Sequence, residues 1–541
     1  MATDDETVTD EIVVVGAGPV GLTAACLLAR DGIAVRVVEK LQRCTTESRA
    51  VGVHARSLEM LAALGVRADL EARGRRITAL EVVDGRTGRT RARVGLGHVR
   101  SRHPYVLDVA QPDTEDVLAG RAAALGVRIE RGVELTGLTQ DADGVTLTLR
   151  SAAGERTLRT GWVVGADGGH STVRDLVGTR LEGGFHGRHF AMADVDADTD
   201  LSPDTIRMFT HPDGMGILFP LAGARVRIMF LVDPPAPGEE LTLARIQELA
   251  DARTSARITV RDPRWLTWFE VHHAQVPRYR HGRVLLAGDA AHIHSPAGAQ
   301  GMNTGMQDAA NLAWKLALVA RGRAGDGLLD SYDAERHPVG AEVVRATTLL
   351  TAVGAGSGPE VVLRDAALFV AGHVRRAADG AAERLAEQTV HYRHGPLSVQ
   401  DGADHRRHGA ARAGDHAPDP AGLCRPDGTP VAVEELLARP GLLLLVRGAD
   451  AVRAAELAEV LGELGVVVRV VPDASSAAGA RDDEVLVDTG DMFGPAYGTG
   501  PERIALIRPD GYLALVAATT DPEPLRRYLA DVLAVRRAAA G

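Results

Sequence analysis

Three glycines near the amino terminus have the spacing of a phosphate-binding turn. They follow the apolar run at residues 12–15 as a G-x-G-x-x-G motif formed by Gly16, Gly18 and Gly21. Glycine at these positions permits a tight turn and lets backbone amides approach a pyrophosphate. Glu39 ends the next apolar run, where a carboxylate can accept hydrogen bonds from a ribose. These residues predict a dinucleotide-binding site, and by themselves they fit NAD and FAD equally.

The elements around these residues follow the order strand, turn, helix, strand. A helical pattern covers residues 22–31 and ends at Gly32, and the second apolar run, AVRVVEK, covers residues 34–40. Such a unit opens an α/β domain whose parallel strands present binding residues at their carboxyl ends. We therefore expect a Rossmann-like first domain.

This first domain is predicted to be discontinuous. Alternating apolar residues, turn pairs and aromatic residues distinguish residues 76–104 and 185–275, which we expect to form a β-rich substrate-binding domain. The remaining α/β pattern covers residues 1–75, 105–184 and 276–400. The β-rich domain is therefore an insertion into the α/β domain.

The carboxyl-terminal part of the chain predicts a separate α/β unit. Residues 401–418, rich in Gly, Asp, His and Arg, predict a linker. Residues 419–541 follow the order strand, helix, strand, strand pair, helix, which is thioredoxin-like. They contain no Cys-x-x-Cys pair, so we expect a packing or dimer-forming module without dithiol chemistry.

Two further acidic residues stand directly after apolar strands. Asp167 follows the run in GWVVGADGG, and Asp289 follows the run in RVLLAGDAAH. At the carboxyl edge of a sheet such a carboxylate can bind a cofactor hydroxyl, although a carboxylate there often serves only as a helix cap. Both residues are candidate cofactor ligands.

The segments that contain these acids resemble a known family. GWVVGADGGHSTVR and GRVLLAGDAAHIHSPAGAQGMNTGMQDA are similar to the DG and GD motifs of the class A flavoprotein monooxygenases, the single-component FAD-dependent aromatic hydroxylases. ESRAVGVHARSLEML, LDVAQPDTEDVL and SYDAERHPVG also resemble signatures of this family, and the similarity covers most of residues 10–345. With the thioredoxin-like tail, the resemblance implies the subgroup that hydroxylates phenols and polycyclic aromatic polyketides.

The resemblance implies an α/β fold with a Rossmann-like FAD-binding domain, an inserted mixed β-sheet substrate domain and a C-terminal thioredoxin-like α/β domain. The expected cofactor-binding residues are Gly16, Gly18, Pro19, Gly21, Glu39, Lys40, Arg49, Gln111, Asp167, Asp289, Pro296, Gly298, Gly301, Met302 and Asn303. Arg49 and Pro296 are also expected to reach the reacting part of the site. Ala299 stands where the family usually has Gly, which alters the expected shape of that loop.

The reaction implied by the resemblance is a monooxygenation. NAD(P)H reduces FAD, dioxygen forms a flavin hydroperoxide, and one oxygen atom is transferred to an electron-rich polycyclic phenol or quinone. Two alternatives stay open, which are a Baeyer-Villiger insertion of oxygen on the same scaffold and a non-catalytic flavin-containing protein that binds such aromatics. No second G-x-G-x-x-G motif is present, so NAD(P)H is expected to approach the flavin transiently.

Other side chains allow two interpretations each. The histidines His54, His272, His273, His292 and His294 could deprotonate a phenol or serve only structural roles, and their spacing predicts no metal site. Met208, Phe209, Phe219 and Met229 alternate on predicted strands of the insertion and are expected either to pack in a core or to line a flat substrate cavity.

Composition supports a small-molecule enzyme. The chain has 541 residues, 45% of them hydrophobic, and 61 basic against 72 acidic residues give a net charge of −11. This acidic balance disfavours binding to nucleic acid or to a membrane surface. Three scattered cysteines and an acidic amino terminus predict a cytoplasmic protein, and we expect a monomer or a homodimer.

Overall fold

A six-stranded sheet forms the centre of the amino-terminal half in the computed structural model. The structure describes residues 11–44, 50–295, 300–355, 375–402, 409–477, 481 and 484–535. In the sheet order β18-β19-β12-β1-β2-β8, the strands are β1 (Ile12–Val15), β2 (Val35–Glu39), β8 (Arg128–Arg131), β12 (Val163–Gly165), β18 (Arg280–His281) and β19 (Val284–Leu286). The pairs from β19 to β8 are all parallel, so the carboxyl ends of five strands meet at one edge.

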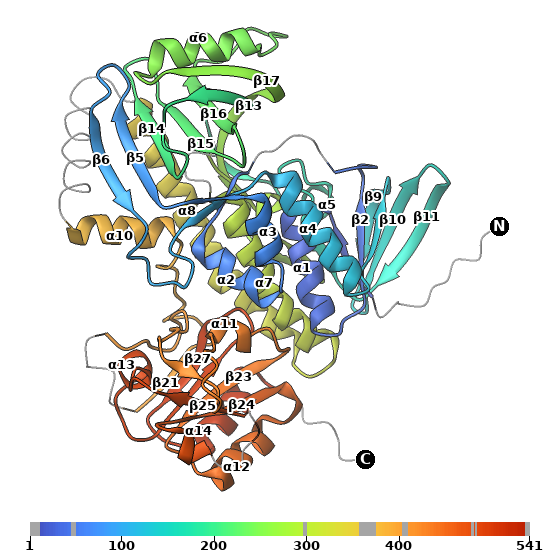
Figure 1. The fold of residues 1–541 in the computed structure, drawn as a ribbon. Helices are drawn as coiled ribbons and strands as arrows, with labels where there is room; N and C mark the ends of the chain where they lie inside the picture. Colours follow the sequence, from blue (N-terminus) through green and yellow to red (C-terminus); the bar gives the residue numbers. More distant parts are fainter. Residues whose placement is uncertain are drawn as a thin grey trace.

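Helices cover this sheet, and its inner strands β1, β12 and β19 are apolar and buried throughout, whereas the edge strands β8 and β18 carry charged and polar residues. Helix α1 (Pro19–Arg30) packs against both α4 (Gln111–Ala124) and α7 (Gly301–Ala320), as Figure 1 shows. Buried residues of strands and helices, such as Val13, Leu22 and Leu285, form one core. Burial on both faces explains why these inner strands show no alternation of polar and apolar residues.

Shorter elements surround the central sheet. The additional helices are α2 (Ala55–Ala63), α3 (Arg67–Arg73), α5 (Thr172–Leu176), α8 (Asp330–Ala355) and α10 (Arg375–Leu385). Two three-stranded sheets consist of β9 (Glu134–Gln140), β10 (Val145–Ser151) and β11 (Gly154–Thr160), and of β3 (Gly52–Val53), β7 (Val106–Asp108) and β4 (Arg75–Ile77).

The inserted segments form a mixed eight-stranded sheet. Its order is β20-β17-β13-β16-β15-β14-β5-β6, and only β14 and β5 pair in parallel. The strands are β5 (Ala79–Asp84), β6 (Thr90–Gly95), β13 (Glu182–Thr199), β14 (Thr205–Thr210), β15 (Gly216–Pro220), β16 (Arg225–Val232), β17 (Ile258–Gln275) and β20 (His292–Ile293). One face packs on α6 (Leu243–Arg253) and the other faces α10 and the strand β7. The predicted α/β class with an inserted mixed sheet is thus confirmed.

A seven-stranded sheet forms the carboxyl-terminal part, in the order β21-β27-β26-β23-β24-β25-β22. The strands are β21 (Val399–Asp401), β22 (Leu423–Cys424), β23 (Leu442–Arg447), β24 (Gly465–Val471), β25 (Val485–Asp488), β26 (Arg503–Ile507) and β27 (Leu513–Ala517). The helices are α11 (Val433–Leu436), α12 (Ala451–Leu461), α13 (Phe493–Tyr497) and α14 (Glu523–Arg527). The expected strand, helix, strand, strand pair and helix correspond to β23, α12, β24, β26 with β27, and α14, whereas β22, α11, β25 and α13 were not predicted. The thioredoxin-like relationship and the domain boundaries stay predictions.

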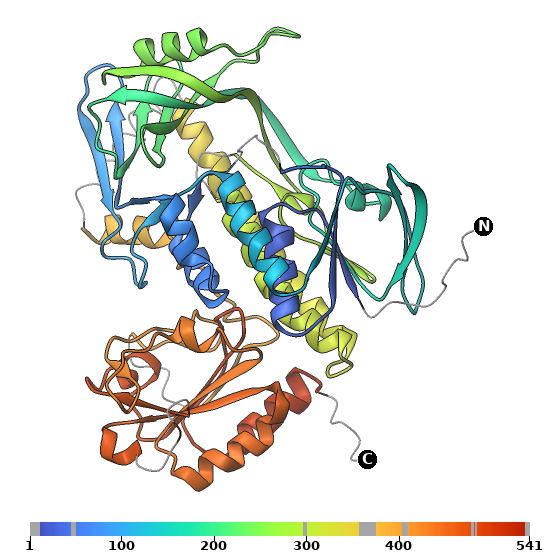
Figure 2. The same cartoon turned by 45° about the vertical axis from the view of Figure 1, so that its right-hand side comes forward.

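Two details refine the expected linker. Val399 already pairs with Leu515 of β27, and His416 bridges to Tyr512. The described residues on both sides of 403–408 therefore lie along the carboxyl-terminal sheet. In Figures 1 and 2 this sheet and the eight-stranded sheet lie at opposite ends, with α1, α4 and α7 between them.

Within the described parts of the chain, no helix combines the length and the apolar character that a membrane crossing requires.

Candidate functional site

The turn between β1 and α1 accepts only glycine at two of its positions. Gly16 has a φ of +103°, and a Cβ there would lie 2.4 Å from the backbone oxygen of Ala166. A Cβ on Gly21 would lie 2.0 Å from the backbone oxygen of Gly16. At Gly18, in contrast, a Cβ would meet no described atom within 4 Å, so the space in front of α1 is open. Pro19 begins the helix, which leaves the amino-terminal amides facing that space.

A cavity of about 200 Å³ borders this turn. Predicted cofactor residues from several elements line it, namely Gly16, Gly18, Glu39, Lys40, Gln111 and Asp167. Arg43 and Arg131 also line the cavity, together with the acidic Glu115 and Glu134, so side chains of both charges border it. The structure therefore brings together residues that lie far apart in the sequence.

Glu39 connects the end of β2 to the glycine turn. Its Oε2 accepts a hydrogen bond of 2.8 Å from the amide of Ala17, and its Oε1 accepts one of 2.8 Å from the amide of Leu41. Each carboxylate oxygen retains a further lone pair, so the same group can also accept a bond from a ribose hydroxyl.

Asp167 caps a helix and lines the cavity at once. Its Oδ2 accepts a 3.0 Å hydrogen bond from the amide of Val173, and its Oδ1 accepts one from the hydroxyl of Ser171, the N-cap of α5. Burial raises the pKa of this carboxyl, while these hydrogen bonds oppose the shift. The capping role considered for acids at strand ends is thus present at Asp167.

Asp289 lies at the same edge of the sheet. It follows β19 within a 3-10 turn at Gly288–Ala290, and its side chain is exposed. Gly288 has a φ of +60°, and a Cβ there would lie 2.9 Å from the Val20 side chain on α1. Because β19, β12 and β1 are parallel neighbours, Asp289 lies at the same carboxyl edge of the sheet as Gly16 and Asp167.

The first turn of α7 is fixed to β3. Asn303 accepts a 2.9 Å hydrogen bond from the amide of His54 and donates one of 2.8 Å to the carbonyl oxygen of Gly52. Gly301 and Met302 lie in the same turn of the helix. Arg49, Pro296 and Gly298, which are also predicted site residues, lie outside the residues that the structure describes.

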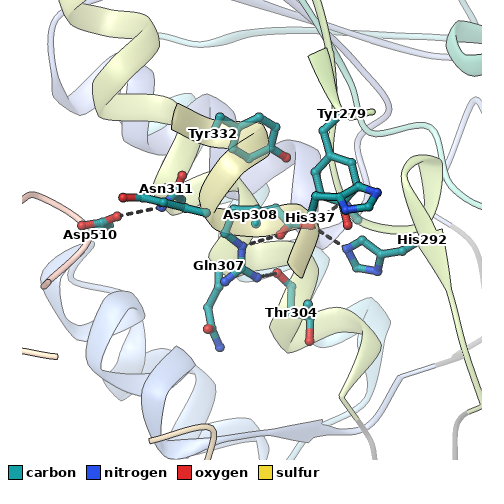
Figure 3. Close-up of polar contacts among 12 residues, drawn as sticks. Tyr279, His292, Thr304, Gln307, Asp308, Asn311, Tyr332, His337 and Asp510 are labelled. Atoms are coloured by element: carbon teal, nitrogen blue, oxygen red, sulfur yellow. Dashed lines mark hydrogen bonds and ion pairs between the residues drawn. The ribbon is translucent and has the colours of Figure 1, made fainter. Parts of the chain in front are cut away.

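A buried polar network lies behind this edge (Figure 3). The Asp308 carboxylate accepts hydrogen bonds from the Gly288 amide at 3.1 Å, from His292 Nε2 at 2.7 Å and from Arg336 Nε at 2.7 Å. Arg336 also donates to the Thr304 carbonyl oxygen at 3.0 Å. Burial is the largest influence on the Asp308 carboxyl and raises its pKa, but Arg336 and His292 together outweigh burial through their charges and hydrogen bonds and hold the pKa below its ordinary value. The network therefore connects the turn that carries Asp289 to α7 and α8.

A second buried cluster joins α7 and α8 to the β26–β27 hairpin. Glu335 accepts hydrogen bonds from Arg508 at 2.7 and 3.0 Å, from Lys315 at 2.8 Å and from Asn311 at 2.8 Å. Asn311 also donates to Asp510 of the hairpin at 3.3 Å, as Figure 3 shows. Neither cluster was predicted from the sequence, although the segment SYDAERHPVG, which contains Glu335 and Arg336, was a signal that could have found them.

The histidines occupy different environments. Burial lowers the pKa of His54 and of His294 to about 4, so both imidazoles are neutral near pH 7. His272 is partly exposed and pairs with Glu270 at 3.0 Å, whereas His273 is buried. Among the described residues, no cluster of three His, Cys, Asp or Glu side chains is arranged to hold a metal ion.

The four apolar candidates for substrate contact divide between two faces of the eight-stranded sheet. Met208, Phe219 and Met229 belong to the apolar cluster that faces β7 and α10. Phe209 belongs to the cluster under α6, on the opposite face. Adjacent residues of a strand point to opposite faces, so Phe209 cannot line a cavity together with the other three.

Comparisons with known proteins agree with this geometry. The model of the FAD binding domain family matches residues 9–347. A 6-methylpretetramide 4-monooxygenase from Streptomyces rimosus is 36% identical over 522 residues, which cover 93% of this chain and 90% of the relative. An anhydrotetracycline hydroxylase structure from Streptomyces rimosus superposes with a TM-score of 0.78 at 29% identity, covering 97% of this chain and 99% of the other. A ternary complex of aklavinone-11 hydroxylase with FAD and aklavinone superposes with a TM-score of 0.73 at 26% identity, covering 98% and 100%.

Proposed function

The chain belongs to the FAD binding domain family and is an FAD-dependent aromatic monooxygenase, and we propose that its substrate is a polycyclic phenol or quinone of the polyketide type. The observation that carries the proposal is the meeting of a dinucleotide site with a large apolar face. The glycine turn follows β1, and Glu39, Asp167 and Asp289 stand at the carboxyl ends of β2, β12 and β19, so they all lie at one edge of the sheet. An apolar face of the inserted sheet is directed toward the same part of the fold.

The residues present fit FAD. The open space at Gly18, the amides at the start of α1 and the cationic Arg43 and Arg131 suit a pyrophosphate. Glu39 has free lone pairs for a ribose, and Asp289 presents an exposed carboxylate for a ribityl hydroxyl. When bound, FAD supplies the redox chemistry, which takes electrons from NAD(P)H and activates dioxygen.

The protein itself orients the reactants and excludes water. The first turn of α7, held by Asn303 against β3, would direct the positive end of the helix dipole toward the expected position of the flavin ring. Met208, Phe219 and Met229 belong to the buried apolar cluster between the inserted sheet, β7 and α10, and this is the side of the sheet that we expect to border a flat substrate. An apolar surface there also keeps water from the reacting atoms.

The decisive experiment combines cofactor consumption with product analysis. Purified holoenzyme is given NADPH or NADH and a panel of polycyclic phenols and quinones, including anhydrotetracycline and aklavinone. The proposal expects substrate-stimulated consumption and a product that gains one oxygen atom. Product NMR then distinguishes hydroxylation from Baeyer-Villiger insertion, and binding without consumption would identify a non-catalytic aromatic-binding protein instead.

The manner of electron delivery forms part of the proposal. The sequence has no second dinucleotide motif, so NAD(P)H must reach the flavin from the surface, and substrate binding is expected to accelerate flavin reduction by orders of magnitude. Anaerobic stopped-flow absorbance tests this expectation. Equal reduction rates with and without a compound that the enzyme hydroxylates would contradict it.

The roles of the chain's parts complete the proposal. Residues 1–75, 105–184 and 276–400 bind FAD, residues 76–104 and 185–275 bind the substrate, and residues 419–541 serve as a packing or dimer-forming module. The acting form is a cytoplasmic monomer or homodimer. Size-exclusion chromatography with light scattering distinguishes the two states.

A further inference from the structure

One buried carboxyl group has no role in the site described above. Asp108 ends β7, the middle strand of the small sheet β3-β7-β4, and its exposed fraction is 0%. Neither of its carboxyl oxygens has a hydrogen-bond partner among the described residues. Buried polar side chains are nearly always hydrogen-bonded, so a carboxyl group without a partner requires an explanation.

The side chain faces the apolar surface of the inserted sheet. Val106, two residues earlier on the same strand, belongs to the apolar cluster that contains Phe219 and Met229, whereas Leu107 packs in the core of the FAD-binding part. Because side chains alternate along a strand, Asp108 lies on the face of Val106. The carboxyl group is therefore directed toward the surface proposed to hold the substrate.

The arginine that acts electrostatically on Asp108 does not hydrogen-bond to its carboxyl group. Arg227 of β16 interacts electrostatically with Asp108, but its Nε and Nη2 donate to Asp194 at 2.6 and 2.8 Å. Its guanidinium also lies 5.4 Å from the ring centroid of Trp265. Burial raises the pKa of Asp108 well above its ordinary value, and the charge of Arg227 only partly opposes the shift. A neutral carboxyl group both donates and accepts hydrogen bonds.

The position also lies close to the expected flavin site. Asp108 pairs across the ladder with Gly52 of β3, and the carbonyl oxygen of Gly52 accepts the hydrogen bond from Asn303 at the start of α7. A ligand atom bound by Asp108 would thus be held one strand away from the first turn of α7. Such a contact fixes the orientation of a flat molecule that apolar packing alone would leave free to rotate.

We propose that Asp108 is a substrate-binding residue whose carboxyl group hydrogen-bonds an oxygen substituent, a phenol hydroxyl or a quinone carbonyl, of the polycyclic aromatic substrate. This inference rests on the proposed function and adds the residue that selects an oxygenated ring. A site that is built to pair with a substrate oxygen discriminates strongly against an analogue that lacks it. The apolar residues around Asp108 provide area, and the carboxyl group provides orientation.

The test compares Asp108→Leu and Asp108→Asn with Phe209→Leu, a control on the opposite face of the inserted sheet. Each holoenzyme is titrated with anhydrotetracycline and with aklavinone, and binding is followed by the visible absorbance of the flavin. Asp108→Leu is expected to weaken binding and to lower kcat/KM by about 10- to 100-fold, while Asp108→Asn stays within a few-fold of wild type. FAD retention is expected to be the same in all variants.

Thermal unfolding of the same holoenzymes supplies a readout that needs no substrate. Asp108→Leu is expected to melt at or above the wild-type temperature, because removing a buried carboxyl group without a partner relieves a cost of folding. A lower melting temperature than wild type, or unchanged binding of both probes, would overturn the proposal. If the wild type oxygenates none of the aromatic panel, the proposed function fails, and the melting comparison still decides whether folding needs this carboxyl group.

Discussion

The ion cluster around Glu335 joins the carboxyl-terminal sheet to the rest of the molecule, and its removal has a calculable effect. Glu335 on α8 is fully buried and receives hydrogen bonds from Arg508 on the hairpin and from Lys315 on α7. Replacing it by Gln keeps the shape but leaves two buried cations with one negative charge fewer. Breaking a buried ion pair from one side costs about 3–5 kcal/mol.

The electrostatics of Glu335 give the same order of magnitude. Burial by itself would raise its pKa, but Arg508 and Lys315 outweigh burial and lower the pKa from 4.5 to about 2. A shift of this size corresponds to roughly 3 kcal/mol. Because the folded-state pKa is depressed, this contribution is present above about pH 4.5 and is lost as the pH falls toward 2.

Urea unfolding of the holoenzyme, monitored between pH 3 and pH 8, measures the effect. The matched control is Glu463→Gln, which removes an exposed pair with Arg323 between the same two parts of the chain and should cost less than about 1 kcal/mol. Glu335→Gln should be destabilised by several times more than the control and should lose part of the wild-type pH dependence below about pH 4.5. Equal destabilisation by the two substitutions, or an unchanged pH dependence, would show that Glu335 contributes no more to stability than an exposed ion pair.

Other substitutions test the cofactor site and the carboxyl-terminal unit. Gly21→Ala places a Cβ 2.0 Å from the Gly16 oxygen and should give colourless protein. Gly120→Ala on α4, where a Cβ would meet no described atom within 4 Å and which does not line the cavity, should retain a yellow flavin, as absorbance at 450 nm will show. Asp289→Ala should lower FAD affinity by about 10-fold, as a fluorescence titration of the apoprotein with FAD will show. The melting temperature of the apoprotein should change little, because the exposed Asp289 side chain is not part of the core. The intact chain should show no insulin disulfide reduction, because Cys424 is the only cysteine beyond residue 400, and measurable reduction would contradict its packing role.

Local patterns were sufficient to predict the strand ends that build the site. The glycine turn, Glu39, Asp167 and Asp289 each follow an apolar strand, and parallel strands bring their carboxyl ends to one edge without any knowledge of side-chain packing. The inserted sheet was equally visible in its alternation. The side of the sheet to which Phe209 points depends on register and was not predicted.

The buried clusters could not be derived from local patterns because their members pair over long distances. Glu335 and Arg508 are 173 residues apart, and Asp308 and Arg336 are 28 residues apart on different helices. Charged residues are usually exposed, so composition and periodicity assign them to the surface. The burial of the Asp108 carboxyl group could not be predicted for the same reason, because nothing in the segment LDVAQPDTED indicates that its first acidic residue is buried.

The route of the chain into the inserted sheet has an evolutionary consequence. The chain leaves the central sheet after β12 and returns on β18, which pairs with β19, the direct hydrogen-bonded neighbour of β12. Arg280 of β18 pairs with Leu285, which pairs with Val164 of β12, so the two ends of the excursion lie about two strand spacings, roughly 10 Å, apart. Recombination between relatives could exchange the segment between β12 and β18, and with it the substrate specificity, without disturbing the strands that bind the nucleotide. A successful chimera would also have to carry β5 and β6, because β5 pairs with β14 inside the exchanged sheet and would otherwise present a foreign edge.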